Sequence, residues 1–335
     1  MSTLLHFCRV ALSTGFHPLP QPPIAVGSVY EGWSPRDDEA TYRFFVPLKA
    51  PPGHVFHLEL GTAEELPERN SRIRVEWQCT CEREEETPCF LHSSEDELRD
   101  QEPSLVHTLC TDFYLNVEKT ARWFQMLIRA AWKGAPISAS WQLKVLPSSR
   151  SCSLRLVDTH KRVFFVDMVF GVQQDNTDIY LSSQTTEALV TPSTSWPQSC
   201  AVAEMKFFRH IDIQAQGDSF HLRCIQACAH LLVGFSFSTY QLKTVVMHLL
   251  TAIPLESWRA RHFAHRMDDI MRYLRSCLEE KRLDHFLIGN EAVPAEITLP
   301  QHFQTSRPVN LFQHLEQEPD KHEQALYEMD ELEDR

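Results

Sequence analysis

The spacing of apolar residues changes once along this chain of 335 residues, and the change falls in a connector rich in Ser, Thr and Pro at 182–199. Ahead of the connector, short apolar or alternating runs predict β-strands. After it, apolar residues recur at helical spacing. A mixed region followed by a helical one is typical of an α+β protein with two lobes. Strands are expected at 42–48, 54–60, 71–79, 141–147, 152–158 and 162–172, and helices in the same region at 2–13 and 117–135.

The domain boundaries follow from this change. We predict an α+β lobe at 1–190, a linker at 191–199, a helical lobe at 200–291 and an acidic C-terminal tail at 292–335. Ser238 or Thr239 offers a side-chain oxygen that can cap the first turn of a helix. The helices after the connector are expected at 200–214, 219–233, 238–252, 258–281 and 311–334.

The overall charge argues against a general nucleic-acid binder. The chain has 32 Lys and Arg residues against 45 Asp and Glu residues, a net charge of -13. A surface of that sign repels phosphate backbones. No apolar run approaches the roughly 18 to 20 residues that span a bilayer.

The stretch that begins at Gly27 has features of a phosphate-binding site. Gly27 and Ser28 form a small-residue turn whose amides and hydroxyl could approach phosphate oxygens. Acids follow at Asp37, Asp38 and Glu39, directly ahead of an apolar strand. Nucleotidyl transfer needs two carboxylates one residue apart on a strand face and a third on a neighbouring strand, which together hold two metal ions.

Thr41 breaks this catalytic pattern. If Glu39 is the first metal-binding acid, Thr41 stands at the second position, and a neutral hydroxyl cannot replace a carboxylate that bridges Mg²⁺ ions. Pairing Asp37 with Glu39 restores two acids but moves them into the loop, where acids are common surface residues. Asp167 suits the third position, because a carboxylate inside an apolar strand needs a metal, a cation or hydrogen-bond donors.

A second group of polar residues has the side chains of a metal site. It consists of Cys79, Cys81, Cys89 and His92, and these ligand types suit zinc. The spacing departs from the common pairs of cysteines two residues apart, and the intervening residues are rich in Glu. A weak zinc site, a disulfide and free thiols all fit the pattern, and free thiols are the simplest interpretation.

The segment at 237–244 reads Phe-Ser-Thr-Tyr-Gln-Leu-Lys-Thr, and Pro254, Trp258, Leu283, Phe286 and Ile288 follow it. These residues resemble the helical lobe of the Mab-21-like proteins, which cyclic GMP-AMP synthase shares. Segments such as GSVYEGWSPRDDE at 27–39 and LEEKRLDHFLIGNE at 278–291 narrow the resemblance. They are similar to the inositol trisphosphate receptor-interacting protein-like branch of that superfamily.

The resemblance implies a nucleotidyltransferase-like fold. Gly27 and Ser28 match the phosphate turn, and Glu39 and Asp167 match the first and third acids, whereas Thr41 does not match the second. The zinc-binding insertion of the synthase is missing, so sensing of double-stranded DNA is not expected. The branch implies a receptor as partner and a membrane anchor ahead of this region, hence membrane association. Without an anchor we expect a cytoplasmic protein.

We therefore predict a catalytically inactive member that works as an interaction protein, with a membrane receptor such as the inositol trisphosphate receptor as its partner. A residual cleft lined by Gly27, Ser28, Glu39, Asp167 and Lys243 would bind a nucleotide or an inositol phosphate without turning it over. No resident cofactor is expected in this hypothesis.

Two alternatives remain open. The first is an active nucleotidyltransferase that holds Mg²⁺ with Glu39, with Asp37 or Asp38, and with Asp167. The second is a pure scaffold whose cleft is closed by its own side chains.

Overall fold

The computed structural model describes residues 16–34, 40–61, 71–82, 89–99, 101–184, 191–217, 219–231 and 237–333. The chain forms two compact units. The first comprises Met1–Val26 and Glu39–Val202 and is called the sheet unit here. The second comprises Gly27–Asp38 and Ala203–Arg335 and is called the helical unit. The predicted α+β class is confirmed, whereas the helix expected at 2–13 lies outside the described residues.

The larger sheet is built around β10 (Val163–Gln173), the strand expected at 162–172. It pairs in parallel with β3 (Thr41–Lys49) and antiparallel with β9 (Cys152–Asp158) and β11 (Tyr180–Ser182). Residues 168–172 of β10 are all buried, because both faces of this part of the strand are covered. The remaining strands of this sheet are β1 (Leu19–Pro20), β2 (Ile24–Val26), β8 (Trp141–Val145) and β12 (Gln198–Ser199).

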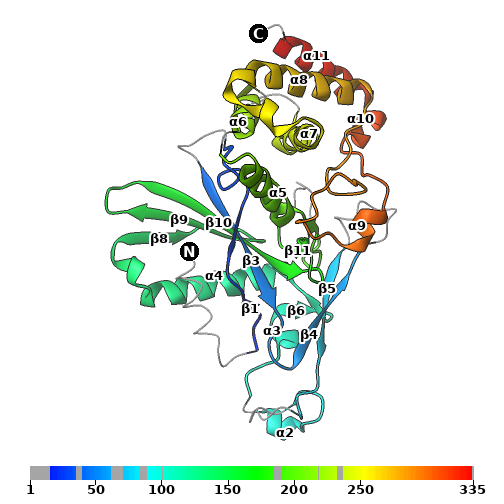
Figure 1. Ribbon diagram of the computed structural model, residues 1–335. Coiled ribbons are helices and arrows are strands. Elements are labelled where there is room, and N and C mark those ends of the chain that lie inside the picture. The colour runs from blue at the N-terminus through cyan, green and yellow to red at the C-terminus, as the bar shows by residue number, and fades with distance from the viewer. Residues whose placement is uncertain are drawn as a thin grey trace. The chain divides into compact units, whose positions relative to one another are not determined.

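Helix α4 (Val117–Gly134) covers one face of this sheet. It starts at Asn116, whose side chain accepts a hydrogen bond from the Lys119 N–H (3.0 Å). Figure 1 shows α4 running beside β8 and β9, and it contacts both strands. Even-numbered residues of β3 and β10 join its core, for example Phe170, whose ring lies 5.6 Å from that of Phe124. Odd-numbered residues of the two strands therefore point to the opposite face.

A smaller antiparallel sheet completes the sheet unit. It contains the antiparallel pair of β4 (His54–Glu59) and β5 (Arg72–Trp77), both expected as strands, followed in space by β7 (Tyr114–Leu115) and β6 (Cys110–Thr111). Two short helices, α2 (Glu95–Leu98) and α3 (Leu105–Leu109), lie between β5 and β6 in the chain.

In the helical unit, α7 (Thr239–Ala252) packs against α6 (His221–Leu231) and α8 (Phe263–Glu279). α5 (Ala201–Gln214) begins at the unit boundary, and α9 (Gln301–Thr305), α10 (Gln313–Gln317) and α11 (Pro319–Glu333) follow α8. Ser238 caps α7, as predicted, because its hydroxyl accepts from the Gln241 N–H (3.1 Å). None of the helices in the described parts of the chain is long and apolar enough to cross a bilayer.

The two units divide the chain differently from the predicted boundaries. Residues 27–34 group with the helical unit, although the sequence places them in the first lobe. Residues of the expected acidic tail also take part in the fold. α11 lies along α8 (Figure 1) and buries Ala325, Met329 and Leu332. α8 itself begins at Phe263, later than expected, because two 3₁₀ turns at Leu255–Trp258 and Ala260–His262 precede it.

Candidate functional site

Asp167 lies in β10 on the sheet face opposite α4. Its Oδ1 accepts hydrogen bonds from the hydroxyls of Ser151 and Ser153, both at 2.8 Å. Arg43 is its register partner on β3, and the Arg43 Nε lies 3.7 Å from the Asp167 Oδ2. This is a charge contact and not a hydrogen bond, since the buried Nε has no hydrogen-bond partner. Two hydroxyl hydrogen bonds and the charge of one guanidinium thus stabilise the partly buried, negatively charged Asp167 side chain.

The side chains of β3 that share this face with Asp167 come from alternate residues, namely Thr41, Arg43 and Phe45. None of them is an acid. Thr41 is the exposed first residue of the strand. The candidate acids Asp37, Asp38 and Glu39 lie outside the described residues. Thr41 stands at the second acid position and the cationic Arg43 lies beside Asp167, so none of the described β3 residues on this face supplies a carboxylate to a two-metal site.

Gly27 and Ser28 form a tight turn in the helical unit. Gly27 has a φ of 84°, a conformation that favours glycine. Its carbonyl oxygen accepts from the N–H groups of Tyr30 (3.0 Å) and Glu31 (2.9 Å), and the Ser28 carbonyl accepts from the Trp33 N–H (2.9 Å). These three amides are consequently used within the turn. The turn directs Glu31 and Trp33 into the interior of the helical unit, where both are buried.

Lys243 is buried at the centre of an ion-paired cluster. Its Nζ lies 2.6 Å from the Glu204 Oε2 and 2.9 Å from the Glu31 Oε1. Glu31 also accepts a hydrogen bond from the Trp33 Nε1 (2.7 Å). Burial alone lowers the pKa of Lys243, and the charges of Glu204 and Glu31 outweigh it and raise the pKa above its usual value. A phosphate group would reach this ammonium only by displacing one of the two carboxylates.

The four candidate metal ligands meet between β5 and α2. The donor atoms of Cys79, Cys81, Cys89 and His92 all lie within 4.8 Å of one another. The Thr80 N–H donates to the Cys89 Sγ (3.5 Å). Backbone hydrogen bonds from Thr80 and Leu91 lower the pKa of the Cys89 thiol to about 5, whereas contacts with Cys79 and Cys89 raise that of Cys81 to about 11. The three cysteines are not in disulfides.

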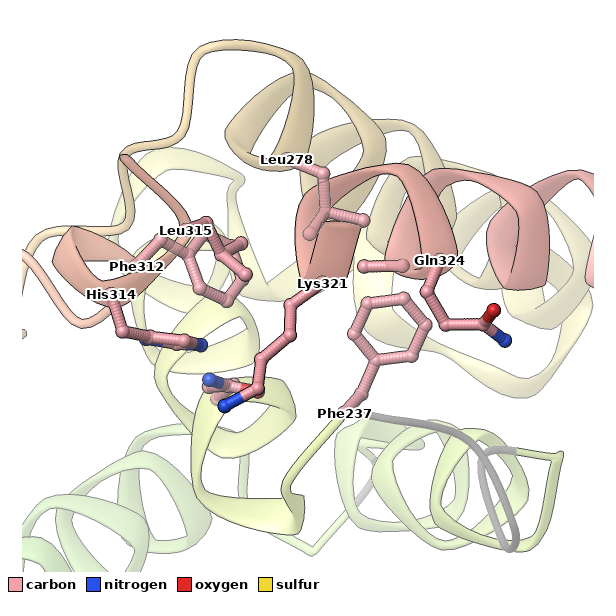
Figure 2. Close-up of a pocket in the computed structure, with 9 residues that line it drawn as sticks. Phe237, Leu278, Phe312, His314, Leu315, Lys321 and Gln324 are labelled. Carbon is pink, nitrogen blue, oxygen red and sulfur yellow. The ribbon is translucent and has the colours of Figure 1, made fainter. Parts of the chain in front are cut away.

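A pocket of about 360 Å³ lies within the helical unit. Figure 2 shows Lys321 reaching across it, with His314 on one side and Phe237 on the other. The walls are mostly apolar, and Lys321 also pairs with Glu318 (2.7 Å). The sequence does not predict this pocket, because much of its wall comes from the segment at 292–335, which has the composition of an acidic tail. The lining residues are Phe237, Gln241, Leu278, Phe312, His314, Leu315, Lys321, Gln324 and Ala325.

Comparisons with known proteins agree with the resemblance found in the sequence. A family model described as the Mab-21 protein HhH/H2TH-like domain matches residues 232–322. Inositol 1,4,5-trisphosphate receptor-interacting protein-like 1 of Rattus norvegicus is 32% identical over 343 residues, which cover 98% of this chain and 62% of the relative. Its counterpart in Mus musculus has the same identity and coverage.

A more distant relative is the inositol 1,4,5-trisphosphate receptor-interacting protein of Homo sapiens, which is 29% identical over 315 residues, 86% of this chain and 57% of the relative. The chain thus spans less than two thirds of the length of these relatives. The match extends through both units and includes the helical segment that carries the family motif. Residues 232–322 therefore match the Mab-21 protein HhH/H2TH-like domain, and nearly the whole chain is similar to the inositol 1,4,5-trisphosphate receptor-interacting protein-like proteins.

Proposed function

We propose that this protein is a catalytically inactive member of the nucleotidyltransferase fold and that it works by binding an inositol 1,4,5-trisphosphate receptor. The observation that carries the first part is the surroundings of Asp167. A two-metal site needs several carboxylates that converge on the ions. Here the register partner of Asp167 is Arg43, and both donors to its Oδ1 are serine hydroxyls.

The charge balance at Asp167 explains why this arrangement disfavours a metal ion. A divalent cation placed against the Asp167 carboxylate would be repelled by the Arg43 guanidinium, whose Nε lies 3.7 Å from the Oδ2. The hydroxyls of Ser151 and Ser153 already occupy the Oδ1. Asp167 in this proposal is a structural residue that joins β10 to β9 and β3.

The second part of the proposal rests on the relatives. Their names describe proteins that interact with the inositol 1,4,5-trisphosphate receptor, and none of the names describes an enzyme. Association of this chain with a membrane would then follow from its partner. A nucleotide or an inositol phosphate could still bind as a ligand, with Gly27, Ser28 and Lys243 as the candidate contacts.

Inactivity is tested by incubating the protein with nucleoside triphosphates and Mg²⁺ or Mn²⁺ and searching for products by mass spectrometry. We expect none, from the wild type or from Asp167→Asn. The variant should lose about 1 kcal/mol of unfolding free energy, because a neutral amide is a weaker acceptor for two hydroxyls. Asp175→Asn, at an exposed loop residue with a φ of 50°, is the matched control and should change little.

Metal-dependent turnover that Asp167→Asn abolishes would contradict the inactive assignment and favour the active alternative. Thermal-shift measurements on the same samples, with nucleoside triphosphates and with inositol phosphates, test ligand binding separately. If a residual cleft remains, we expect one of these ligands to raise the melting temperature of the protein without being turned over. No shift with any of them would favour the pure scaffold.

Partner binding is tested with the purified chain and a purified inositol 1,4,5-trisphosphate receptor. We expect saturable binding that Asp167→Asn leaves unchanged, because the variant alters a mostly buried carboxylate and keeps the size and shape of the side chain. Biolayer interferometry with the receptor immobilised gives the dissociation constant. A dissociation constant of about 10 μM corresponds to a binding free energy of roughly 7 kcal/mol. Absence of binding at that protein concentration would contradict the proposed partner.

A further inference from the structure

Three sulfur atoms surround one imidazole nitrogen in the sheet unit. The His92 Nδ1 lies 3.4 Å from the Cys79 Sγ, 3.1 Å from the Cys81 Sγ and 3.7 Å from the Cys89 Sγ. Cys79 and Cys81 come directly after β5, and Cys89 and His92 come directly before α2. Two short chain segments therefore deliver four donor atoms to one point.

Hydrogen bonds alone do not account for this arrangement. A neutral imidazole nitrogen has either one lone pair or one proton, so it can form one good hydrogen bond. Three sulfur contacts on the same nitrogen therefore leave at least two of the sulfur atoms without a hydrogen bond to it. A metal ion placed among the four atoms would satisfy all of them, because each donor directs a lone pair at the ion.

The distances also fit a particular ion. Zinc–sulfur bonds of about 2.3 Å and zinc–nitrogen bonds of about 2.05 Å, at tetrahedral angles, place sulfur and nitrogen about 3.6 Å apart. The three observed separations, 3.1 to 3.7 Å, lie around this value. Thiolate and imidazole donors in tetrahedral geometry favour zinc over the harder Mg²⁺ and Ca²⁺.

We propose that Cys79, Cys81, Cys89 and His92 bind one zinc ion in a closed, structural site. Four protein ligands leave no open position for water or substrate. The Thr80 N–H, which donates to the Cys89 Sγ at 3.5 Å, supplies the kind of outer hydrogen bond that orients a ligating thiolate. This site is independent of the proposed partner and of the Asp167 region.

The segment around the site has little else to hold it. α2 buries none of its residues, and from Leu91 to Arg99 every described side chain is exposed or half-buried. Phe90 supplies apolar contacts here, since its ring lies 4.7 Å from that of Phe16 and 5.3 Å from that of His54. A metal that joins residues 79–81 to residues 89–92 would provide the missing cross-link.

The test measures metal in the purified full chain, prepared without chelators or a metal-affinity tag, by inductively coupled plasma mass spectrometry. We expect about one zinc per chain. Replacement of zinc by Co²⁺ should give the visible absorption bands of a tetrahedral site and a near-ultraviolet band from sulfur-to-metal charge transfer. These bands identify thiolate ligands in a way that loosely bound surface metal does not reproduce.

Single variants assign the ligands. Cys79→Ser, Cys81→Ser, Cys89→Ser and His92→Ala should each lower the zinc content at least fivefold. The controls Cys200→Ser and His57→Ala change a thiol and an imidazole outside the cluster and should keep full zinc. Since a ligand variant can also misfold, the wild type is compared before and after chelation. Hydrogen exchange should rise in residues 78–99 and remain unchanged in β10.

Three results would overturn the proposal. The first is a chain that binds no zinc after reduction and incubation with one equivalent of zinc. The second is full zinc retention in the four ligand variants. The third is stoichiometric iron or copper in place of zinc, which would show that the donor set holds a different metal.

Discussion

Replacing Lys243 with Met is expected to lower the free energy of unfolding of the helical unit by about 3 to 5 kcal/mol. The ammonium is buried between Glu204 and Glu31, and the three side chains are 6%, 9% and 1% exposed. Without it, two carboxylates face each other in the interior with no cation between them. Chemical unfolding in urea, followed by tryptophan fluorescence, measures the loss as a lower midpoint.

Two further variants separate this effect from a general loss of a lysine. Lys321→Met removes an exposed lysine of the same unit that pairs with Glu318, and it should cost less than about 1 kcal/mol. The triple variant Lys243→Met with Glu31→Gln and Glu204→Gln neutralises the cluster and should regain a substantial part of the stability. If Lys243→Met were no less stable than Lys321→Met, the buried ion pairs would not be a main stabilising feature of the unit.

The sequence was most informative where structure depends on neighbouring residues. The helix expected at 117–135 is α4, Val117–Gly134, because its apolar spacing and its Asn cap are local. The almost wholly apolar strand expected at 162–172 is β10, and it pairs with three strands. The pairing of β10 with β3 could not be predicted, because the parallel register that places Arg43 opposite Asp167 is set by tertiary packing.

The C-terminal segment shows how charge can conceal the packing of a helix, although a helix is expected at 311–334. Acidic residues dominate 319–333, and this composition suggested a tail. The signal that remained was the spacing of Ala325, Met329 and Leu332, four and three residues apart, which forms one apolar stripe. α11 buries these three residues in the helical unit.

The candidate sites were only partly predictable for a similar reason. The partners of Lys243 lie 39 and 212 residues away in the chain, so no local pattern identifies them. The sequence supplied the four residues of the cysteine and histidine cluster, but their unusual spacing gave no evidence of convergence. That evidence came from the turns after β5 and before α2, which bring the donor atoms within 4.8 Å of one another.

His285 should make the helical unit less stable in mild acid. The Leu287 N–H donates to its Nδ1 (3.1 Å), so the ring proton of the neutral form is on Nε2, which donates to the Tyr240 hydroxyl oxygen (2.7 Å). A second proton on Nδ1 would face the Leu287 N–H. Burial, with a smaller effect from the charge of His248, lowers the pKa of His285 to about 4.

Because this pKa is below the value of about 6.5 in the unfolded chain, the unfolded state binds the extra proton first as the pH falls. The stabilising contribution is therefore complete above pH 6.5 and is lost progressively down to about pH 4. Between pH 7 and pH 5 this loss is about 2 kcal/mol for one histidine. His221, whose pKa burial also lowers to about 4, contributes in the same direction.

His285→Gln isolates the share that belongs to His285. Glutamine retains one donor and one acceptor but does not titrate, so the variant should lose about 2 kcal/mol less than the wild type between pH 7 and pH 5. Urea unfolding at the two pH values measures the difference. His57→Gln, at a half-exposed histidine that pairs with Glu76 in the sheet unit, should keep the wild-type dependence. If the unfolding free energy of His285→Gln fell between pH 7 and pH 5 by as much as that of the wild type, the His285 ring would not be the cause of the acid sensitivity of the helical unit.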